Sequence, residues 1–258
     1  MRTGALSGHR ILVTRAVEQA ADLANAVEAA GGTALRLPLL EIVPRDAQQI
    51  SDDVGRMNSA DIVIYVSPNA VRHGFAWHPE AAETAAIGPT TRKELELRGV
   101  AHVVCPDNGY DSESLLDNEA FTDVAGKTIR IIRGQDGREL LGSTLRNRGA
   151  TVQYLAAYLR RARRVPEYEI REFAHRLRRG EISCITVMSD ATVESLVAIL
   201  PVADRELLRH TRLVTPSSRV LKNINELVPG LSVTLAPGPR PDDMILGLIA
   251  SLKQDNTE

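Results

Sequence analysis

Short segments rich in hydroxyl groups and glycine recur along the chain, each after an apolar run and before a helical pattern. Three of them are Ser-Pro-Asn at 67–69, Gly-Pro-Thr-Thr at 88–91 and Thr-Pro-Ser-Ser at 215–218. A small polar residue is a good helix cap, and a proline fits the first helical turn. Because helix amino termini present unpaired backbone N–H groups, these segments are suited to holding anions.

Two more segments have the same chemistry. The glycine loop Arg-Gly-Gln-Asp-Gly-Arg at 133–138 joins an apolar run to a helical pattern, and Asp-Ser-Glu at 111–113 opens another short helix. Each segment by itself is typical of ordinary helix capping. Five of them at comparable positions predict a cleft that is rich in N–H and O–H donors and binds anionic groups.

Motifs for other chemistries are missing from the sequence. The loop at 133–138 lacks the third glycine of a dinucleotide loop, and neither GxxxxGK[ST] nor GxSxG occurs. Cys105 and Cys184 lie inside apolar runs and are expected to be buried thiols rather than ligands. The histidines form no i, i+4 pair. We therefore expect no metal and no cofactor, and donors that bind carboxylates or another delocalised anion.

The charge balance limits the classes of partner. With 31 Lys+Arg, 33 Asp+Glu and 3% aromatic residues, the chain lacks the basic excess and the stacking platforms of a general nucleic-acid binder. The arginines at 160–164 are expected to form a solvated face offset by nearby glutamates; the alternative is that they attract a polyanion. No apolar run reaches the length of a signal peptide or a membrane span, so a cytoplasmic location is expected.

The elements that position these segments are strands that alternate with helices, which is the pattern of a parallel α/β sheet. Ten strands are predicted, enough for one large sheet or for two sheets of five. They are Ile11–Arg15, Thr33–Leu37, Asp61–Val66, Ala85–Ile87, Ala101–Cys105, Thr128–Arg133, Thr151–Leu155, Ile182–Met188, Arg212–Thr215 and Leu231–Leu235.

Internal repeats favour two sheets. Three pairs of segments match at offsets of 118, 122 and 127 residues, and each pair combines the same strand, turn and helix pattern. The matches align Arg15 with Arg133, Ser67 with Ser189, and Pro89 with Pro216. The chain therefore contains two similar modules.

Two extended segments lie at matching places in the repeat, since Leu40 aligns with Tyr158. We predict that they pair as a two-stranded β hinge over 39–44 and 158–165. The chain then forms a discontinuous α/β domain (1–38 plus 166–258) that carries an inserted α/β domain (45–157). Each domain is predicted to have three layers around a mainly parallel five-stranded sheet. Two consecutive halves are the alternative arrangement.

Taken in order, these motifs resemble the uroporphyrinogen-III synthase family over essentially the whole chain. The resemblance rests on the opening RILVTRAVEQAADLANAVEAAGGTALRLPLLEI, on VSPNAV, AAIGPTT, YDSESLL and RGQDGRELL, and on the segment around Tyr158. The chain departs from the family pattern at Ala16, Asp190 and Thr215.

The resemblance implies two α/β domains joined by a two-stranded linker, and a lyase that needs no cofactor. Such enzymes close hydroxymethylbilane, a linear tetrapyrrole with eight carboxylates, to uroporphyrinogen III, with loss of water and inversion of ring D. This step belongs to heme and siroheme biosynthesis. Holding the substrate curled is chiefly a problem of orientation. The resemblance assigns Tyr158 as the catalytic residue, which hydrogen-bonds the departing hydroxyl.

The other candidate residues are expected to bind the substrate. They are Thr14, Arg15, Ser67, Asn69, Gly88, Thr90, Thr91, Ser112, Arg133, Gly134, Ser189, Ser217 and Ser218. Expected partners are this small molecule and, by hand-over, hydroxymethylbilane synthase, with no nucleic acid and no membrane; a monomer is expected. Two other functions stay open: a non-catalytic relative that binds a tetrapyrrole or regulates, and a hinged two-domain binding protein.

Overall fold

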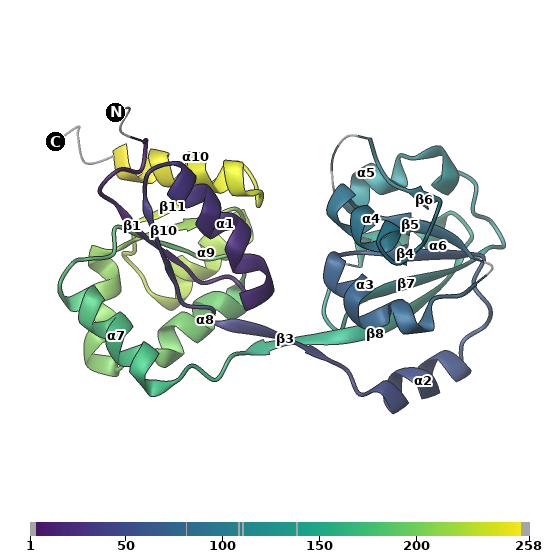
Figure 1. The fold of residues 1–258 in the computed structure, drawn as a ribbon, viewed down its shortest axis with the longest axis horizontal. Helices are drawn as coiled ribbons and strands as arrows, with labels where there is room; N and C mark the ends of the chain where they lie inside the picture. The colour runs from purple at the N-terminus through teal and green to yellow at the C-terminus, as the bar shows by residue number, and fades with distance from the viewer. Residues whose placement is uncertain (1–3, 81, 108, 110, 138, 254–258) are drawn as a thin grey trace. The chain divides into compact units, whose positions relative to one another are not determined.

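The chain divides into two units and passes from one to the other twice (Figure 1). The computed structural model describes residues 4–253, apart from residues 81, 108, 110 and 138. Unit 1 comprises residues 1–41 and 161–258, and unit 2 comprises residues 42–160. Unit 1 is therefore built from two separate stretches of the chain, whereas unit 2 is one continuous stretch.

Unit 1 is built on a sheet of five parallel strands. Their order is β11-β10-β9-β1-β2, so strands from both stretches of the chain pair at the centre, where Leu12 of β1 lies opposite Ile185 of β9. The strands are short and mostly apolar, as strands covered on both faces are. Their bounds are β1 Arg10–Val13, β2 Thr33–Arg36, β9 Cys184–Thr186, β10 Arg212–Thr215 and β11 Val233–Leu235.

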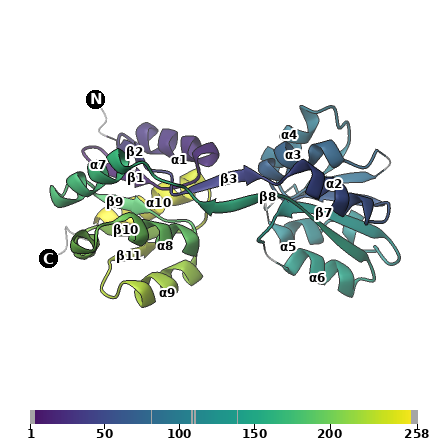
Figure 2. The ribbon, with the colours of Figure 1, turned by 90° about the horizontal axis from the view of Figure 1, so that it is seen from below.

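Helices cover both faces of this sheet (Figure 2). Ile11 belongs to one buried cluster with Leu23 of α1, and the next residue, Leu12, belongs to the opposite cluster with Leu196 of α8. Burying each such side chain contributes about 1.5–3 kcal/mol. The first face carries α1 Val17–Ala29 and α10 Pro241–Lys253; the second carries α7 Glu167–Arg178, α8 Asp190–Ile199, the 3-10 helix η3 Val202–His210 and α9 Ser218–Leu227.

Unit 2 has a sheet of six strands in the order β3-β8-β7-β4-β5-β6. Strands β8, β7, β4, β5 and β6 are parallel. The edge strand β3 runs the other way, since the N–H of Arg45 donates to Ala157 and the N–H of Arg163 donates to Leu39. The bounds are β3 Leu40–Pro44, β4 Ile62–Tyr65, β5 Glu83–Ala86, β6 Val103–Val104, β7 Thr128–Gly134 and β8 Thr151–Ala162.

The sheet of unit 2 is also covered on both faces. Val63 and Tyr65 of β4 point into one buried cluster, while Ile62 and Ile64 point into the other, as strand periodicity requires. The first face carries α2 Ala47–Gly55, α3 Pro68–Gly74, the 3-10 helix η1 Phe75–Trp77 and α4 Pro89–Glu96; the second carries α5 Ser112–Leu116, the 3-10 helix η2 Glu119–Phe121 and α6 Leu140–Asn147.

The two sheets have the same strand order once the internal repeat is used to match them. Strands β2-β1-β9-β10-β11 of unit 1 correspond to β8-β7-β4-β5-β6 of unit 2. The order along the chain differs, because the β4–β6 half comes first in unit 2 and its counterpart β9–β11 comes last in unit 1.

All ten predicted strands are present, and the predicted mainly parallel α/β fold is confirmed. Two details of the prediction were wrong. The strand expected to end at Leu155 continues to Ala162, because the segment at 40–44 pairs with it. For the same reason the second sheet has six strands instead of five. A separate two-stranded hinge over 39–44 and 158–165 stays a prediction.

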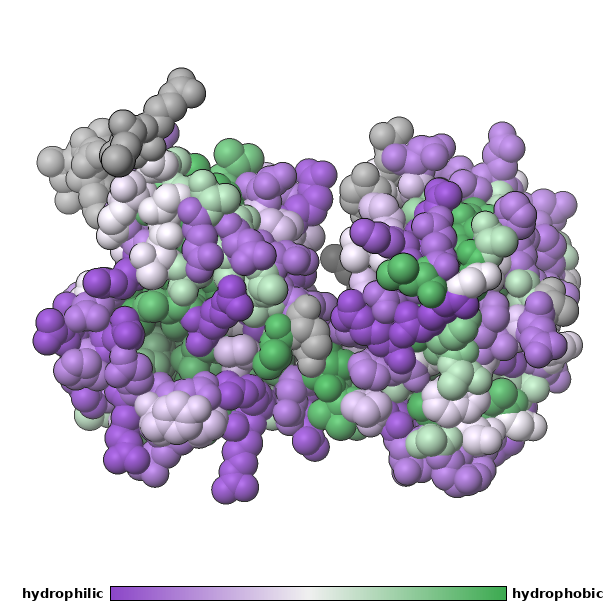
Figure 3. All heavy atoms as spheres, viewed as in Figure 1, coloured by the Kyte–Doolittle hydropathy of each residue, from purple (hydrophilic) through white to green (hydrophobic). Residues whose placement is uncertain are grey.

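Polar side chains cover most of the visible face of each unit, with small hydrophobic groups between them (Figure 3). Single exposed apolar side chains such as Leu97 and Val202 are normal for a folded domain. None of the helices in the described ranges has the length and apolar character needed to cross a membrane.

Candidate functional site

Capped helix starts line the carboxyl edge of the sheet in unit 2. After β4, Ser67 Oγ accepts the N–H of Ala70 at 3.1 Å, and after β6, Asp111 Oδ1 accepts the N–H of Ser114 at 2.8 Å. Gly88 precedes α4, whose first residue is a proline. The helix starts predicted from these segments are confirmed. Since β4, β5 and β6 are parallel neighbours, the first turns of α3, α4 and α5 meet at one edge.

Tyr158 belongs to the same edge of unit 2. The residue is 1% exposed, and its hydroxyl lies 3.1 Å from Ser67 Oγ. Its ring is part of the buried cluster that includes Ile132, and its centroid lies 5.9 Å from that of the His73 ring on α3. The structure packs this side chain inside unit 2, because it lies on the face of β8 that α3 covers. Its place at the start of a hinge over 158–165 stays a prediction.

Gly134 makes room for the Tyr158 ring. It pairs with Tyr158 across β7 and β8, next to an irregularity in the register between Arg133 and Gly134. A Cβ at this position would lie 2.8 Å from Cε2 of Tyr158, closer than real Cβ contacts. The observed role of this glycine is therefore close packing against the tyrosine.

Arg133 is held inside unit 2 by a carboxylate and a ring. Its Nη2 lies 2.9 Å from Glu139 Oε1, and its guanidinium carbon lies 4.2 Å from the centroid of the Tyr154 ring. Glu139 also accepts the Tyr154 hydroxyl at 2.8 Å. These two bonds hold the pKa of Glu139 below its usual range, while burial and the bond to Glu139 raise the pKa of Tyr154. Arg138, in the same glycine loop, lies outside the described residues.

The other predicted residues of unit 2 differ in exposure. Asn69 and Thr91 are 2% and 4% exposed, inside the first turns of α3 and α4. Thr90 is exposed and Ser112 is half-buried, so their polar groups reach the surface at this edge. Tyr110, which opens the motif before α5, lies outside the described residues.

The carboxyl edge of unit 1 has the equivalent helix starts. Ser189 caps α8 and Ser217 caps α9, each by accepting a backbone N–H of the first turn, at 3.3 and 3.4 Å. These two serines follow the neighbouring parallel strands β9 and β10. Both units thus present first-turn helix ends at the edge where anions bind in open parallel sheets.

The first strand of unit 1 ends in residues that are less accessible than predicted. Thr14 is fully buried, and its hydroxyl donates to the C=O of Thr186. Its hydroxyl is therefore bonded within the core of unit 1, and its role in substrate binding stays a prediction. Arg15 is half-buried with its Nε 3.3 Å from Gln19 Oε1, and Ser218 on α9 is exposed.

Two arginine–carboxylate pairs in unit 1 were missed from the sequence. Arg219 in the first turn of α9 pairs with Asp190 in the first turn of α8. Arg240 Nε lies 2.8 Å from Asp243 Oδ2 at the start of α10. The three-residue spacing of the second pair is a signal that could have revealed it. The first pair joins two helices, so spacing alone could not identify the partner of Asp190.

The arginine cluster at 160–164 is partly neutralised, as expected. Arg161 Nε lies 2.7 Å from Glu41 Oε1, and Arg163 makes two bonds of 2.8 Å to the carboxylate of Glu169. The bond to Arg163 lowers the pKa of Glu169. The other two arginines of the segment are exposed.

A half-buried histidine packs beside the aromatic core of unit 2. His78 Nδ1 lies 3.1 Å from the hydroxyl of Tyr65, and its ring stacks on Phe75 with centroids 5.1 Å apart. Burial lowers the pKa of His78 and raises the pKa of Tyr65. Both side chains are therefore held in their neutral forms near pH 7.

We expect the protein to lose stability as the pH falls from about 7 to about 5.5. The unfolded His78 takes up a proton near the usual pKa of 6.5, whereas the folded side chain resists protonation, so acid favours the unfolded chain. This contribution is fully present above 6.5 and is lost as the pH falls through the lowered folded pKa. Thermal unfolding of wild type and His78→Gln across this range tests it. The variant should lose less stability; parallel curves would contradict the prediction.

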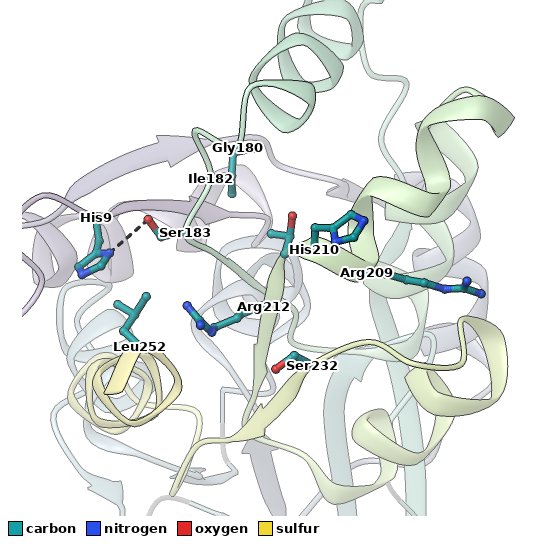
Figure 4. A pocket seen from close by; sticks show the side chains of 10 residues that line it. His9, Gly180, Ile182, Ser183, Arg209, His210, Arg212, Ser232 and Leu252 are labelled. Carbon is teal, nitrogen blue, oxygen red and sulfur yellow. Dashed lines mark hydrogen bonds between the residues drawn. The ribbon is translucent and has the colours of Figure 1, made fainter. Parts of the chain in front are cut away.

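A pocket of unit 1 opens at the opposite, amino-terminal edge of its sheet (Figure 4). It has a volume of about 530 Å³, and its lining includes His9, Ser183, Arg212 and Ser232 at the starts of four strands. Its lining residues include none of the predicted site residues. Helices end at this edge and present carbonyl groups, which disfavour anions. The candidate site therefore stays at the carboxyl edges.

Metal ligands are not gathered in the parts of the chain that the structure describes. Within them, no group of three or more His, Cys, Asp or Glu side chains could hold a metal ion. Of the two cysteines, Cys184 is buried as predicted, whereas Cys105 is half-buried. Burial raises the pKa of the Cys105 thiol, which disfavours the thiolate.

Comparison with known proteins gives a consistent result. The family model described as uroporphyrinogen-III synthase HemD matches residues 21–245. The uroporphyrinogen-III synthase of Escherichia coli (strain K12) is 31% identical over 227 residues, which is 84% of this chain and 91% of that protein. The enzyme of the same name from Salmonella typhimurium is 33% identical over 228 residues, with the same two coverages.

Two solved structures have a similar fold. A mutant uroporphyrinogen III synthase from the extremely thermophilic bacterium Thermus thermophilus aligns with a TM-score of 0.55 at 18% identity, covering 96% of this chain and 100% of that chain. The uroporphyrinogen-III synthetase from Helicobacter pylori 26695 aligns with a TM-score of 0.59 at 11% identity, covering 92% and 97%. At these identities the likeness shows the fold.

Proposed function

The chain belongs to the uroporphyrinogen-III synthase family, and we propose that it closes hydroxymethylbilane to uroporphyrinogen III in porphyrin and heme biosynthesis. In this lyase reaction the terminal hydroxyl of the linear tetrapyrrole leaves as water. The azafulvene cation that remains attacks the substituted carbon of ring D. The spiro intermediate then fragments and recloses with ring D inverted.

The hydrogen bond between Tyr158 and Ser67 is the observation that supports Tyr158 as the residue that assists the loss of water. Ser67 Oγ accepts the N–H of Ala70, so the serine proton is available for the Tyr158 oxygen 3.1 Å away. When Ser67 donates, the phenol proton of Tyr158 is left to hydrogen-bond the departing hydroxyl of the substrate. Each bond in such a chain polarises the next, which strengthens the phenol as a donor.

Substrate carboxylates are proposed to bind at the capped helix starts. Backbone N–H groups and hydroxyls at Thr90, Ser112, Ser189, Ser217 and Ser218 offer donors without any metal. The substrate already tends to lose water, so its orientation accounts for more of the catalysis than acid–base strength does. Arg133 would join this set only by loosening its contact with Glu139.

The direct test is to supply freshly made hydroxymethylbilane and to separate isomers I and III after oxidation to porphyrins. The uncatalysed reaction closes without inversion and gives isomer I. We expect isomer III to predominate with the protein present. Isomer I alone would overturn the proposed activity, and tight tetrapyrrole binding in that case would favour the non-catalytic relative.

Partners and location follow the same proposal. We infer a monomer that works in the cytoplasm and receives its substrate from hydroxymethylbilane synthase. Coupled assays support hand-over if isomer III exceeds the amount expected from free diffusion of the unstable intermediate. Sedimentation of the purified protein measures its oligomeric state.

Activity should survive removal of metal ions. The site residues proposed above are hydroxyls, backbone N–H groups and a phenol, none of which needs a metal to act. We expect the same rate of isomer III formation before and after exhaustive chelation, without added nucleotide or flavin. A rate that falls on chelation and returns with one divalent ion would contradict this expectation.

A further inference from the structure

The ion pair between Asp190 and Arg219 joins two neighbouring helix starts in unit 1. Asp190 lies in the first turn of α8, which follows β9, and Arg219 lies in the first turn of α9, which follows the adjacent parallel strand β10. Asp190 Oδ2 contacts Nη1 of Arg219. The pair therefore lies at the carboxyl edge of unit 1, where the proposed function places substrate carboxylates.

This pair is less complete than the Arg240–Asp243 pair of the same unit. Arg240 binds both oxygens of Asp243, at 2.8 and 3.3 Å, and this pairing holds the pKa of Asp243 below its usual range. By contrast, Asp190 Oδ1 is buried and has no hydrogen-bond partner among the described residues. Asp190 thus holds Arg219 with one oxygen only.

The exposure of the two side chains indicates which of them can move out of the ion pair. The Arg219 side chain is 75% exposed, whereas that of Asp190 is 21% exposed. An exposed ion pair contributes little to stability, because water and salt compensate for its loss. The guanidinium of Arg219 can therefore exchange one carboxylate for another at low cost, while Asp190 stays in the first turn of α8.

We propose that Arg219 binds a carboxylate of the tetrapyrrole, and that Asp190 competes with the substrate for this arginine. The inference rests on the proposed function, because that function supplies the polycarboxylate. A guanidinium binds a carboxylate through two parallel N–H bonds, which the single contact with Asp190 does not provide. The competition also helps the product to leave, since the product carries the same carboxylates.

The two partners should have opposite effects when they are changed. Arg219→Gln removes the cation, so the substrate loses a charge-assisted contact and KM should rise roughly tenfold. Asp190→Asn removes both the competitor and a negative charge near the bound carboxylate, so KM should fall roughly three- to tenfold. A pair with a purely structural role would instead weaken folding in both variants and leave KM unchanged.

The experiment measures KM for hydroxymethylbilane and the Kd of uroporphyrin III, read from its fluorescence, for wild type and both variants. Arg209→Gln is the matched control, because it removes an arginine from the same unit at the opposite edge of the sheet, where Arg209 lines the pocket of Figure 4. We expect this control to keep the wild-type KM and Kd. Thermal unfolding is recorded for each variant to show that it folds.

Several results would overturn the inference. They are a KM and Kd unchanged in Arg219→Gln, a weaker affinity in Asp190→Asn, or an equal rise in KM for Arg209→Gln, which would indicate general charge attraction. The proposed function fails separately, if wild type yields isomer I alone. In that case the Kd of uroporphyrin III still measures whether Arg219 and Asp190 act in opposite directions.

Discussion

Replacing Tyr158 by phenylalanine is expected to lower the rate of uroporphyrinogen III formation by about tenfold or more. General-acid assistance is typically worth roughly 10²–10⁴-fold, and the low end applies because this substrate loses water without help. The lost contact is one that strengthens as the hydroxyl departs, so kcat should fall more than KM rises. The rate of isomer III formation under saturating substrate measures the effect.

Stability measurements separate this role from packing. The ring stays in place in Tyr158→Phe, and only the bond to Ser67 is lost, which costs about 1 kcal/mol. Ser67→Ala is the comparison variant: it removes the same bond and keeps the phenol, and it also removes the cap of α3, so its loss of stability should be the larger one. We expect a smaller rate loss from it. Wild-type rates in Tyr158→Phe would remove the phenol from the mechanism, and a rate loss with a large drop in stability would favour a packing role.

Replacing Gly142 by alanine is expected to destabilise the protein by about 1–3 kcal/mol, the usual cost of overpacking. A Cβ at this position on α6 would lie 1.8 Å from the hydroxyl oxygen of Tyr154, so the ring must move. That movement breaks the 2.8 Å bond from Tyr154 to Glu139. The higher helix propensity of alanine offsets up to about 1 kcal/mol of this loss of stability. Denaturant unfolding measures the net change.

Gly55 provides the control for this substitution. It ends α2, its backbone is not in the left-handed region, and an added Cβ would have no atom within 4 Å. Gly55→Ala should therefore leave stability unchanged or raise it by up to about 1 kcal/mol. Equal effects at the two positions would show that the approach of Tyr154 to α6 is not what constrains Gly142.

The sequence was enough to predict the strands, the caps and the repeat, because these depend on local patterns. Ser67, with a proline after it and apolar residues before it, could be placed at a helix start from spacing alone. The repeat also predicted that residues 39–44 pair with residues 158–165, but local patterns did not show that the second segment continues the strand that begins at Thr151.

The parts of the site that were missed are contacts between elements. In the sequence, Glu139 is only an acidic residue near a helix start. Its contacts, one oxygen with Tyr154 and the other with Arg133, are seen only in the structure. Asp190 was visible as a departure from the family pattern, but its partner on α9 was not. The burial of Thr14 has the same origin, because its hydroxyl bonds to β9, which belongs to the second stretch of the chain in unit 1.

The strand order of the two sheets also determines when each can assemble during synthesis on the ribosome. Unit 2 is a continuous stretch, 42–160, so all its strands except the start of β3 and the end of β8 emerge together. In unit 1, β1 pairs with β9 at the centre of the sheet. Ile11 therefore lacks its pairing partner, Cys184, until that residue has been synthesised. The amino-terminal strand must therefore wait for more than half of the protein, although domains usually fold in the order of synthesis. During this interval the apolar edge of β1 is the part of the nascent chain that most needs protection from aggregation.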